Sequence, residues 1–371
     1  MSKSVLVVSR YFHPINSPRS FRTTELVKEL CRQGHRVTLM THHRPEYHDE
    51  LAATYGFDII DLGARRAPDI AINPANRLTS LVTRLARRGL LQLLEYPESE
   101  WTFRVYRALK RLDRTFDLMI SIATPYPIHW GVALARSAER PLATTWVADC
   151  GDPYMGERLD SFRKFFYFEY VERYFCRKMD HLSVPIANAI PAYYPEYHDK
   201  IVVIPQGFKF SETRSLLQPY TPHAVPTFAY TGSFIPGRRD PRPILDYLLD
   251  QPQDFRFHIY TQMQGLVADH AQRSGGRVIV HDYIPRDQLI GTLSRMDFLL
   301  NIENGVPEML PSKLIDYWLV GRPILSLDSN ALDTTQLDAF LRGNYDARLQ
   351  LENMERYNIE RVAQKFVALH P

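Results

Sequence analysis

Apolar runs of strand length alternate with helical patterns along this chain, and the alternation occurs in two series. The first series opens with the run Ser4–Ser9 (SVLVVS), continues with an amphipathic helix over 20–34, and adds a second apolar run at Arg36–Thr41. Such a succession predicts a βαβ unit, in which parallel strands are covered by helices on both faces. Further strands of this series are expected at 57–61, 117–122 and 142–147, with helices between them, and the series closes with a strand at 201–205.

The second series begins after a stretch, 218–226, that holds three prolines and little periodicity and therefore predicts a linker. A chain of 371 residues exceeds the size at which one core usually keeps growing, so we expect two domains, 1–217 and 218–350. The final segment, 351–369, is amphipathic and predicts a C-terminal helix within 351–371. In the second domain we expect strands at 227–231, 256–260, 278–282, 298–302 and 323–327, and helices at 242–249, 265–274, 286–295 and 312–319.

Composition excludes several classes of protein. The three cysteines, Cys31, Cys150 and Cys176, are widely spaced and match neither a disulfide framework nor a zinc site. The N-terminal apolar run is too short for a signal peptide, and no run of 18 apolar residues predicts a membrane span. The net charge is only +3 and no nucleic-acid-binding motif is present. We therefore expect a soluble cytoplasmic protein that does not bind nucleic acid.

The stretch 307–323 carries the most informative chemistry of the chain. It places Glu308 and Asp316 at either end of a turn that opens a helix, directly after an apolar run. Free backbone N–H groups at a helix start attract a diphosphate, Lys313 adds positive charge, and a carboxylate one turn further can accept hydrogen bonds from ribose hydroxyls. The pattern favours a nucleotide-sugar site. The same pattern would also arise if Asp316 were a solvated acid in the first helical turn and Lys313 a surface lysine.

These residues and others along the chain resemble the retaining GT-B glycosyltransferases of glycosyltransferase family 4. The family separates two acidic residues by seven others, as Glu308 and Asp316 are separated here, with Asp in place of the second Glu. The resemblance implies an α/β GT-B fold, with two Rossmann-like, doubly wound parallel-sheet domains facing a central cleft and the segment 351–371 packing back on the first domain. The other matching motifs are Tyr11 to Pro18, Arg22 to Thr38, Trp146 to Asp149 with Asp152-Pro153, Val203 to Phe208, and Tyr230 to Gly232.

The resemblance also implies roles for residues of the second domain. Glu308 would contact the donor sugar and Asp316 the ribose, while the backbone of Leu310, Pro311 and Ser312, together with Lys313, would hold the phosphates. The loop after the first strand, Gly232 to Arg239, would face the phosphates as well. Family members carry an Arg where this chain has Ser233. Arg238 or Arg239 would then bind the phosphates in its place. The alternative is that both arginines are only solvent-exposed charges of the loop.

In the first domain the resemblance implies an acceptor-side wall. The turn around Asn16 stands where the family has a glycine-rich loop. Arg22 matches an arginine that recurs in the family, and a role as a surface residue fits Arg22 equally well. His129 follows a predicted strand end, and Asp149 stands at the end of another, with Gly151 where relatives have an Arg. Asp149, or Asp152 beside it, would orient the acceptor hydroxyl or act as a base, and either could instead cap the next segment.

The implied activity is the transfer of a sugar, of hexosyltransferase type, from a nucleoside-diphosphate sugar to a glycan or lipid-linked acceptor in surface polysaccharide or glycolipid synthesis. No Asp-x-Asp pair occurs, and neither a metal ion nor another cofactor is expected. Two alternatives stay open. A sugar-nucleotide epimerase of the same fold would bind the same donor, and a non-catalytic scaffold subunit would explain Ser233, Gly151 and the lost glycine loop.

One segment predicts contact with a membrane. Residues 76–95 alternate leucines with Arg77, Arg84, Arg87 and Arg88 at helical spacing. Basic amphipathic helices of this kind lie on anionic membranes, where lipid-linked acceptors are found. A core helix with a solvated basic face fits the same pattern equally well. The expected location is thus the cytoplasm, with peripheral contact to the inner face of the plasma membrane as the further option.

Overall fold

The computed structural model describes residues 2–68, 77–156, 164–303 and 312–371, without the side chains of 77–81 and of Ser312. The described chain forms two compact units. One comprises Met1–Phe208 with Arg356–Pro371, and the other comprises Lys209–Glu355.

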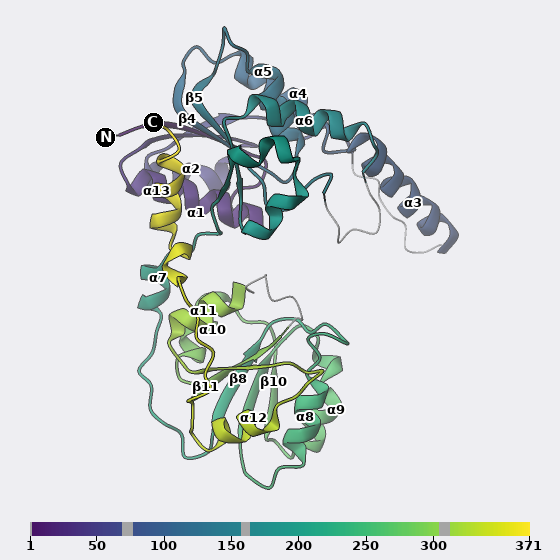
Figure 1. The fold of residues 1–371 in the computed structure, drawn as a ribbon, viewed down its shortest axis with the longest axis vertical. Helices are drawn as coiled ribbons and strands as arrows, with labels where there is room; N and C mark the ends of the chain where they lie inside the picture. The colour runs from purple at the N-terminus through teal and green to yellow at the C-terminus, as the bar shows by residue number, and fades with distance from the viewer. Residues whose placement is uncertain (1, 69–76, 157–163, 304–311) are drawn as a thin grey trace. The chain divides into compact units, whose positions relative to one another are not determined.

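The first unit is built on a parallel sheet whose seven described strands run in the order β3-β2-β1-β4-β5-β6-β7 (Figure 1). The order reverses between β1 and β4, the position at which a doubly wound sheet opens for ligands. The strands are β1 (Ser4–Ser9), β2 (Arg36–Thr41), β3 (Asp58–Asp61), β4 (Phe116–Ile122), β5 (Ala143–Asp149), β6 (His181–Val184) and β7 (Ile201–Val203).

Alternating side chains of these strands fill two cores, because successive residues of a strand point to opposite faces. Leu6 and Val8 of β1 pack under α4, α5 and α6, whereas Val5 and Val7 pack under α1 and α13. The described helices of this unit are α1 (Pro18–Arg32), α2 (Pro45–Tyr55), α3 (Arg77–Leu94), α4 (Glu100–Lys110), α5 (Pro127–Ala135), α6 (Phe168–Lys178) and α13 (Ile359–Val367). Two short 3-10 helices, Ala187–Ala192 and Pro195–Lys200, precede β7.

Local signals set the ends of α1. Ser17 caps its first turn by accepting a hydrogen bond from the Ser20 amide at 3.2 Å, and Pro18 takes the first helical position, where no amide hydrogen is needed. Gly34, at φ +82°, follows the last turn in the left-handed conformation that ends many helices.

The second unit contains a parallel sheet of five described strands in the order β10-β9-β8-β11-β12. Its centre is aromatic, because the Phe228 ring stacks between Phe257 and Phe298 at centroid distances of 4.5 and 4.4 Å. The strands are β8 (Thr227–Thr231), β9 (Arg256–Tyr260), β10 (Val278–His281), β11 (Phe298–Ile302) and β12 (Ile324–Leu327).

Helices cover both faces of this second sheet as well. α8 and α12 pack over Phe228 and Leu300, and α10 and α11 pack over Ala229 and Leu299. The described helices are α7 (Phe210–Ser215), α8 (Arg242–Leu249), α9 (Ala268–Arg273), α10 (Arg286–Leu293), α11 (Ser312–Val320) and α12 (Thr334–Leu341), with 3-10 helices at Gln264–Leu266 and Met354–Tyr357.

The structure departs from the sequence-based elements in a few places. The expected C-terminal helix is confined to α13 (Ile359–Val367), which packs against α1 through Val362 and Phe366. The helices α2, α6, α7 and α12 and the strand β6 had not been predicted. α7 belongs to the second unit, where the Phe210 ring packs against Trp318 at 5.5 Å, although it precedes the proline-rich stretch 218–226.

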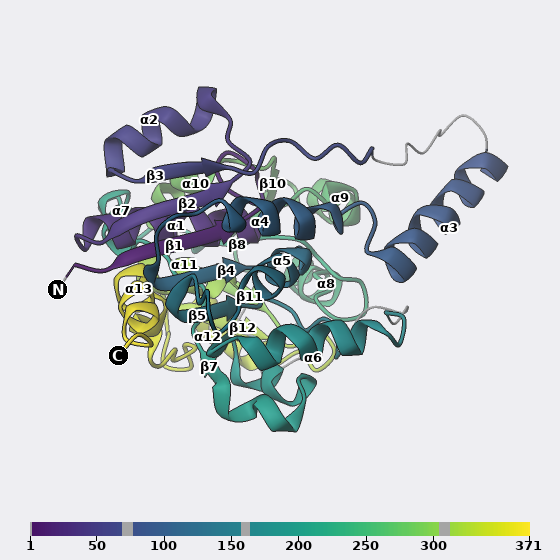
Figure 2. The same cartoon turned by 90° about the horizontal axis from the view of Figure 1, so that it is seen from above.

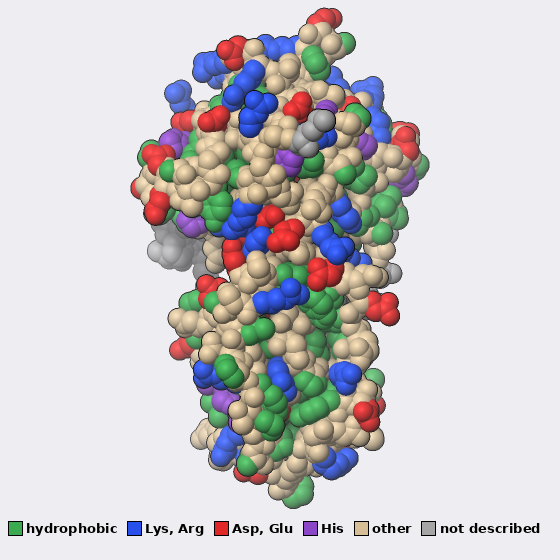
Figure 3. All heavy atoms as spheres, turned by 90° about the vertical axis from the view of Figure 1, so that its left-hand side faces the viewer, with side chains coloured by type: hydrophobic (Ala, Val, Ile, Leu, Met, Phe, Trp, Pro, Cys, Tyr) green, Lys and Arg blue, Asp and Glu red, His purple; other side chains and the backbone are tan. Residues whose placement is uncertain are grey.

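Two surface features bear on function. None of the described helices is long and apolar enough to cross a membrane. The face drawn in Figure 3 intermixes Lys and Arg with Asp and Glu side chains, whereas α3, seen apart from the first sheet in Figure 2, carries arginines and no acidic residue from Arg77 to Leu94.

Candidate functional site

In the second unit, a pocket of about 270 Å³ opens where the strands β8 and β9 end. This is the edge at which parallel α/β sheets bind ligands. Gly232, predicted from sequence, follows β8 with φ +115° and donates its amide to the Tyr260 carbonyl at 3.0 Å. Tyr260 and Tyr283, which form aromatic walls of the pocket, were not predicted as site residues, although Tyr260 ends β9 and Tyr283 follows β10. The lining residues are Thr231, Gly232, Ser233, Tyr260, Thr261, Gln262, Tyr283, Ile284 and Leu289.

Lys313 lies near this edge, on the first turn of α11. Its Nζ is 4.1 Å from the centre of the Tyr230 ring and, among the described residues, has no hydrogen-bond partner. Burial, followed by repulsion from Arg239, holds the pKa of Lys313 well below its ordinary value. A buried lysine that lacks a partner is costly by itself, so this group is ready to receive an anion.

Arg239, rather than Arg238, accompanies Lys313. The Arg239 Nη1 donates to the Ser233 carbonyl at 3.4 Å, and its buried Nε has no partner in the described chain. The Arg238 side chain is exposed, while its carbonyl accepts from the Ser329 hydroxyl at 2.8 Å. The turn from Gly232 to Arg239 thus brings one guanidinium beside the lysine.

Asp316, one turn along α11, is held by a residue that sequence analysis did not assign. Arg286, at the start of α10, donates from Nη2 and Nε to the Asp316 Oδ1 at 2.5 and 3.1 Å, and from Nη2 to the Thr213 hydroxyl at 3.1 Å. Burial raises the pKa of Asp316, and Arg286 offsets part of the rise. No periodic pattern in the sequence marks Arg286, because its partner is 30 residues away.

Part of the predicted donor site lies outside the described residues. Glu308, Leu310 and Pro311 fall in the segment that the structure does not describe, and Ser312 is described only as the first residue of α11.

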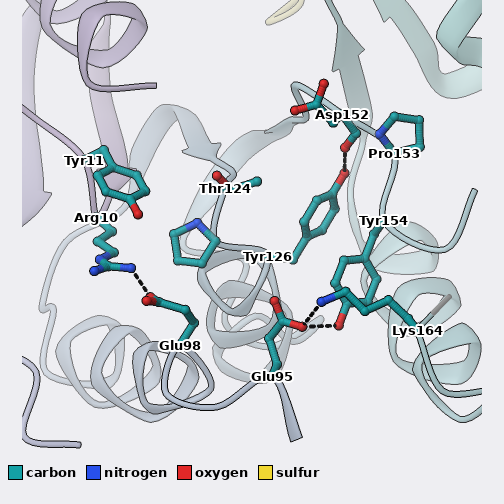
Figure 4. A pocket seen from close by; sticks show the side chains of 11 residues that line it. Arg10, Tyr11, Glu95, Glu98, Thr124, Tyr126, Asp152, Pro153, Tyr154 and Lys164 are labelled. Carbon is teal, nitrogen blue, oxygen red and sulfur yellow. Dashed lines mark hydrogen bonds and ion pairs between the residues drawn. The ribbon is translucent and has the colours of Figure 1, made fainter. Parts of the chain in front are cut away.

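A second pocket, of about 240 Å³, lies in the first unit beside the switch point between β1 and β4 (Figure 4). Glu95 accepts from the Tyr154 hydroxyl at 2.9 Å and pairs with Lys164. The φ of Glu95 is +50°, a left-handed conformation that non-glycine residues adopt at an energetic cost and often near functional sites. The pocket is lined by Arg10, Tyr11, Glu95, Glu98, Thr124, Pro125, Tyr126, Asp152, Pro153, Tyr154 and Lys164.

Asp149 and Arg22, both predicted site residues, form a buried pair beneath this region. Arg22 donates from Nε to Oδ2 at 2.5 Å and from Nη2 to Oδ1 at 2.6 Å, and Ser183 donates to Oδ1 at 2.6 Å. Burial alone would raise the pKa of Asp149, but Arg22, Arg19 and Ser183 outweigh it and hold the pKa below its ordinary value. With 1% of Asp149 and 3% of Arg22 exposed, neither side chain faces solvent, and neither lines the pocket.

His129 is also buried, with 0% of its surface exposed. The Trp146 Nε1 donates to the Ser121 Oγ at 2.8 Å, which leaves the Ser121 proton for the His129 Nδ1 at 2.7 Å. The other ring nitrogen lies 3.5 Å from the Cys150 Sγ. Burial lowers the pKa of His129 to about 3, so the ring is neutral near pH 7 and bonded on both sides.

Arg19 occupies the space that Gly151 leaves open. A Cβ at position 151 would lie 1.3 Å from the Arg19 Nη2, and the Arg19 Nη1 is 3.7 Å from the Asp149 Oδ2. The guanidinium expected after Asp149 in the family pattern is therefore present, but it comes from α1. Asn16, in the preceding turn, is exposed and has no positive φ.

Comparisons with known proteins agree with this architecture. A family model described as "Glycosyl transferase 4-like domain" matches residues 20–207, and no curated protein matches the chain. Among solved structures, a glycosyltransferase from Rickettsia africae shares 12% identity, covering 100% of this chain and 94% of its own, at a TM-score of 0.58.

Two further structures share the fold at similar distance. HepE from Anabaena, in complex with UDP, shares 12% identity over 99% of each chain at a TM-score of 0.55. A UDP-GlcNAc 2-epimerase from Neisseria meningitidis, bound to UDP-GlcNAc, shares 13% identity over 99% of each chain at 0.52. At these identities the structures establish the two-domain GT-B fold alone. Since the family model covers just over half of the 371 residues, the protein belongs to the glycosyl transferase 4-like family.

Proposed function

We propose that this protein transfers a sugar from a nucleoside-diphosphate sugar to a hydroxyl of a glycan or lipid-linked acceptor, with retention of configuration. The observation that carries the proposal is the pair of cations in the second unit, the buried Lys313 Nζ and the neighbouring Arg239, both with donors that have no partner among the described residues. Lys313 lies one helical turn before Asp316, and Arg239 donates to the carbonyl of Ser233, which lines the strand-end pocket.

The arrangement suits a nucleoside diphosphate. The diphosphate would receive hydrogen bonds from Lys313, Arg239 and the amides at the start of α11, which offset the cost of burying the lysine. The Tyr260 and Tyr283 rings offer apolar surface for a base at the pocket wall. Asp316 would then accept from the ribose hydroxyls, in exchange for one of its bonds to Arg286.

The proposed chemistry needs stabilisation of the leaving group above all. The bond between the sugar anomeric carbon and the phosphate oxygen breaks, and a bond from that carbon to the acceptor oxygen forms on the same face. The acceptor proton passes to the departing phosphate, whose charge Lys313 and Arg239 stabilise. Glu308 is proposed to contact the donor sugar. Because Asp149 and His129 are buried and fully bonded, we assign them the positioning of Arg22 and Trp146 rather than proton transfer.

The proposed setting is the synthesis of surface polysaccharide or glycolipid on the cytoplasmic side of a membrane. HepE and the epimerase carry UDP and UDP-GlcNAc in their structures, and a uridine nucleotide is accordingly the first donor to test. A hexose and a reaction without a metal ion are part of the same proposal.

Binding to the second unit can be tested with UDP, GDP, ADP and their sugars in thermal-shift and calorimetric titrations. A matching nucleotide at 100 times its Kd should stabilise the protein by about 2.7 kcal/mol. Lys313→Met should weaken that binding roughly 10- to 100-fold, the usual worth of a charge-assisted hydrogen bond. Lys365→Met, which removes an exposed lysine of α13, is the matched control and should bind normally. Equal binding by Lys313→Met would refute the assignment.

Turnover separates the proposal from its alternatives. A transferase consumes the sugar nucleotide only when an acceptor-bearing membrane extract is present, an epimerase converts it without an acceptor, and a scaffold subunit consumes nothing. Consumption that is independent of the extract would replace the transferase assignment with an epimerase.

A further inference from the structure

Another pocket of the second unit, of about 620 Å³, has no role in the proposed function, and we call it the sheet-face pocket. It lies on the side of the sheet that α10 covers, because His258 of β9 is the register partner of Ala229, which packs under α10. Its walls come from the strands β8 to β10, from α10, and from the chain that leads from α7 into the proline-rich stretch 218–226.

Three parallel rings form the strand wall of the sheet-face pocket. Tyr260 and His281 are register partners on β9 and β10, and their rings stack at a centroid distance of 4.5 Å with planes 10° apart. The His258 ring is parallel to that of His281 within 8°, and its Nδ1 lies 2.9 Å from the His281 Nε2. This wall is therefore a flat aromatic surface, on which the apolar face of another ring can pack.

The hydrogen bond between the two imidazoles fixes what they can offer to a ligand. Burial, followed by repulsion from His281 and His223, lowers the pKa of His258 to about 4, and burial lowers the pKa of His281, so both rings are neutral near pH 7. A neutral imidazole has one N–H donor and one acceptor nitrogen. Because one inner nitrogen donates to the other, one outer nitrogen is a donor and the other an acceptor, and these two roles can only exchange together.

The two outer nitrogens, the His258 Nε2 and the His281 Nδ1, have no hydrogen-bond partner among the described residues. A ligand that contacts both must fit either arrangement of the protons. A hydroxyl group does so because it donates and accepts, whereas an ionised carboxylate only accepts. On the opposite wall α10 adds the exposed side chains of Asp287, Gln288 and Arg295. Their two charges are of opposite sign, which favours a neutral, hydroxyl-rich ligand.

From these contacts we propose that the sheet-face pocket binds a neutral oligosaccharide. Its hydroxyls bond to the outer imidazole nitrogens and to the polar side chains of α10, and the apolar faces of its sugar rings pack on the ring wall. The inference goes beyond the proposed function, because it assigns a glycan site to the second unit that the transfer itself does not use. For an enzyme that acts on a glycan, a second hold on the same chain raises the effective concentration of the glycan.

NMR of protein that carries isotope-labelled histidine ring nitrogens tests this site directly and requires no activity. Maltotriose, cellotriose, mannotriose and chitotriose are suitable probes, because they are neutral and differ in sugar or linkage. At least one of them should shift the ring signals of His258 and His281 together. The signal of His198, whose Nε2 is bonded to the Tyr193 carbonyl in the first unit, should stay in place. If none of the four trisaccharides shifts the two signals, the proposal is wrong.

Substitutions then locate the bound trisaccharide. His281→Phe keeps a ring beside Tyr260 but removes the nitrogens, and should weaken the binding at least about tenfold. Gln288→Ala, on the opposite wall, should weaken it about three- to tenfold. Gln364→Ala, at an exposed glutamine of α13, is the matched control and should bind normally. Thermal unfolding confirms that each variant is folded. Unchanged binding by His281→Phe would overturn the site.

A further variant separates this site from the nucleotide pocket, with which it shares Tyr260. Tyr283→Ala alters the nucleotide pocket alone and should bind the trisaccharide as the wild type does. Loss of binding in this variant would place the saccharide in the nucleotide pocket and contradict the inference. Failure of the nucleotide titrations, with trisaccharide binding intact, would instead refute only the transferase proposal.

Discussion

Replacing Asp149 with Asn should destabilise the first unit strongly. Arg22 and Asp149 are 3% and 1% exposed and share two hydrogen bonds at 2.5 and 2.6 Å. The substitution keeps the side-chain volume but leaves the guanidinium buried without its counter-charge, and turns an amide N–H toward another donor. Removing one partner of a buried ion pair typically costs 3–5 kcal/mol, and we expect a loss in that range.

Urea unfolding followed by tryptophan fluorescence measures this loss. Trp101, Trp130 and Trp146 all lie in the first unit, and Trp318 lies in the second. With a urea dependence of about 2–3 kcal/mol/M, the midpoint of the first unit should fall by about 1–2.5 M. Asp58→Asn is the control, because the Asp58 carboxylate is 74% exposed and 3.6 Å from Arg114, and a surface pair of this kind is worth about 1 kcal/mol or less.

The pH dependence follows from the direction of the shift. Because the pKa of Asp149 is lowered in the folded protein, its stabilisation is fully present above the unfolded pKa, near 3.9, and is lost as the pH falls below that value. The Asn variant should lack this acid-dependent loss. If Asp149→Asn shifted the midpoint no more than Asp58→Asn and yet abolished sugar transfer, Asp149 would be a catalytic group and the assignment as a buried partner would be wrong.

Three further substitutions follow from the same geometry. Lys313 has a lowered pKa in the free protein, so binding of a nucleoside diphosphate should be accompanied by uptake of a proton and should weaken as the pH rises. Calorimetry in buffers of different ionisation enthalpy measures this uptake. Lys313→Arg should remove the proton uptake, and an unchanged uptake would refute the role of Lys313. Arg286→Gln should let burial raise the pKa of Asp316 further, so the nucleotide affinity of this variant should fall more steeply than that of the wild type as the pH is lowered; superimposable pH profiles would contradict the pairing. Gly151→Ala places a methyl group 1.3 Å from the Arg19 guanidinium. Because this guanidinium is the end of a flexible side chain that is 17% exposed, it should move aside at a cost of about 1 kcal/mol or less; urea unfolding measures the cost, and a loss of about 3 kcal/mol, as in an overpacked core, would show that Arg19 is fixed in place.

Short-range patterns were sufficient for most of the fold. The runs Ser4–Ser9, Arg36–Thr41 and Phe298–Ile302 are the strands β1, β2 and β11, because short apolar runs of five or six residues are typical of strands in a sheet covered on both faces. The strand His181–Val184 escaped detection since four residues with a polar start give little signal. α5 was expected only as a helix without bounds between two strands, because nearly all of its residues are buried and show no amphipathic period.

Some residues of the candidate site could likewise be predicted from the sequence, and others could not. Lys313 and Asp316 were predicted from a helix start, which is a local feature, and Gly232 from the family resemblance. In the structure Lys313 lies 4.1 Å from the ring of Tyr230 in β8, the strand that Gly232 follows. Arg286, Arg19 and Lys164 had no such signal. Their partners are 30, 130 and 69 positions away in the chain, so only the folded sheets bring them together.

The amino-acid sequence alone determined that this protein has two parallel α/β sheets and which helix start is the proposed diphosphate site, because hydrophobic periodicity and helix-end amides act within a few residues. The tertiary structure decided which charged side chains form pairs with each other. Asp149 is bound to Arg22 and buried, Asp316 is held by Arg286, and Lys313 keeps an Nζ with no partner in the described chain. Identical side chains differ in this manner because the pairing and desolvation of a charge depend on neighbours that are remote in sequence.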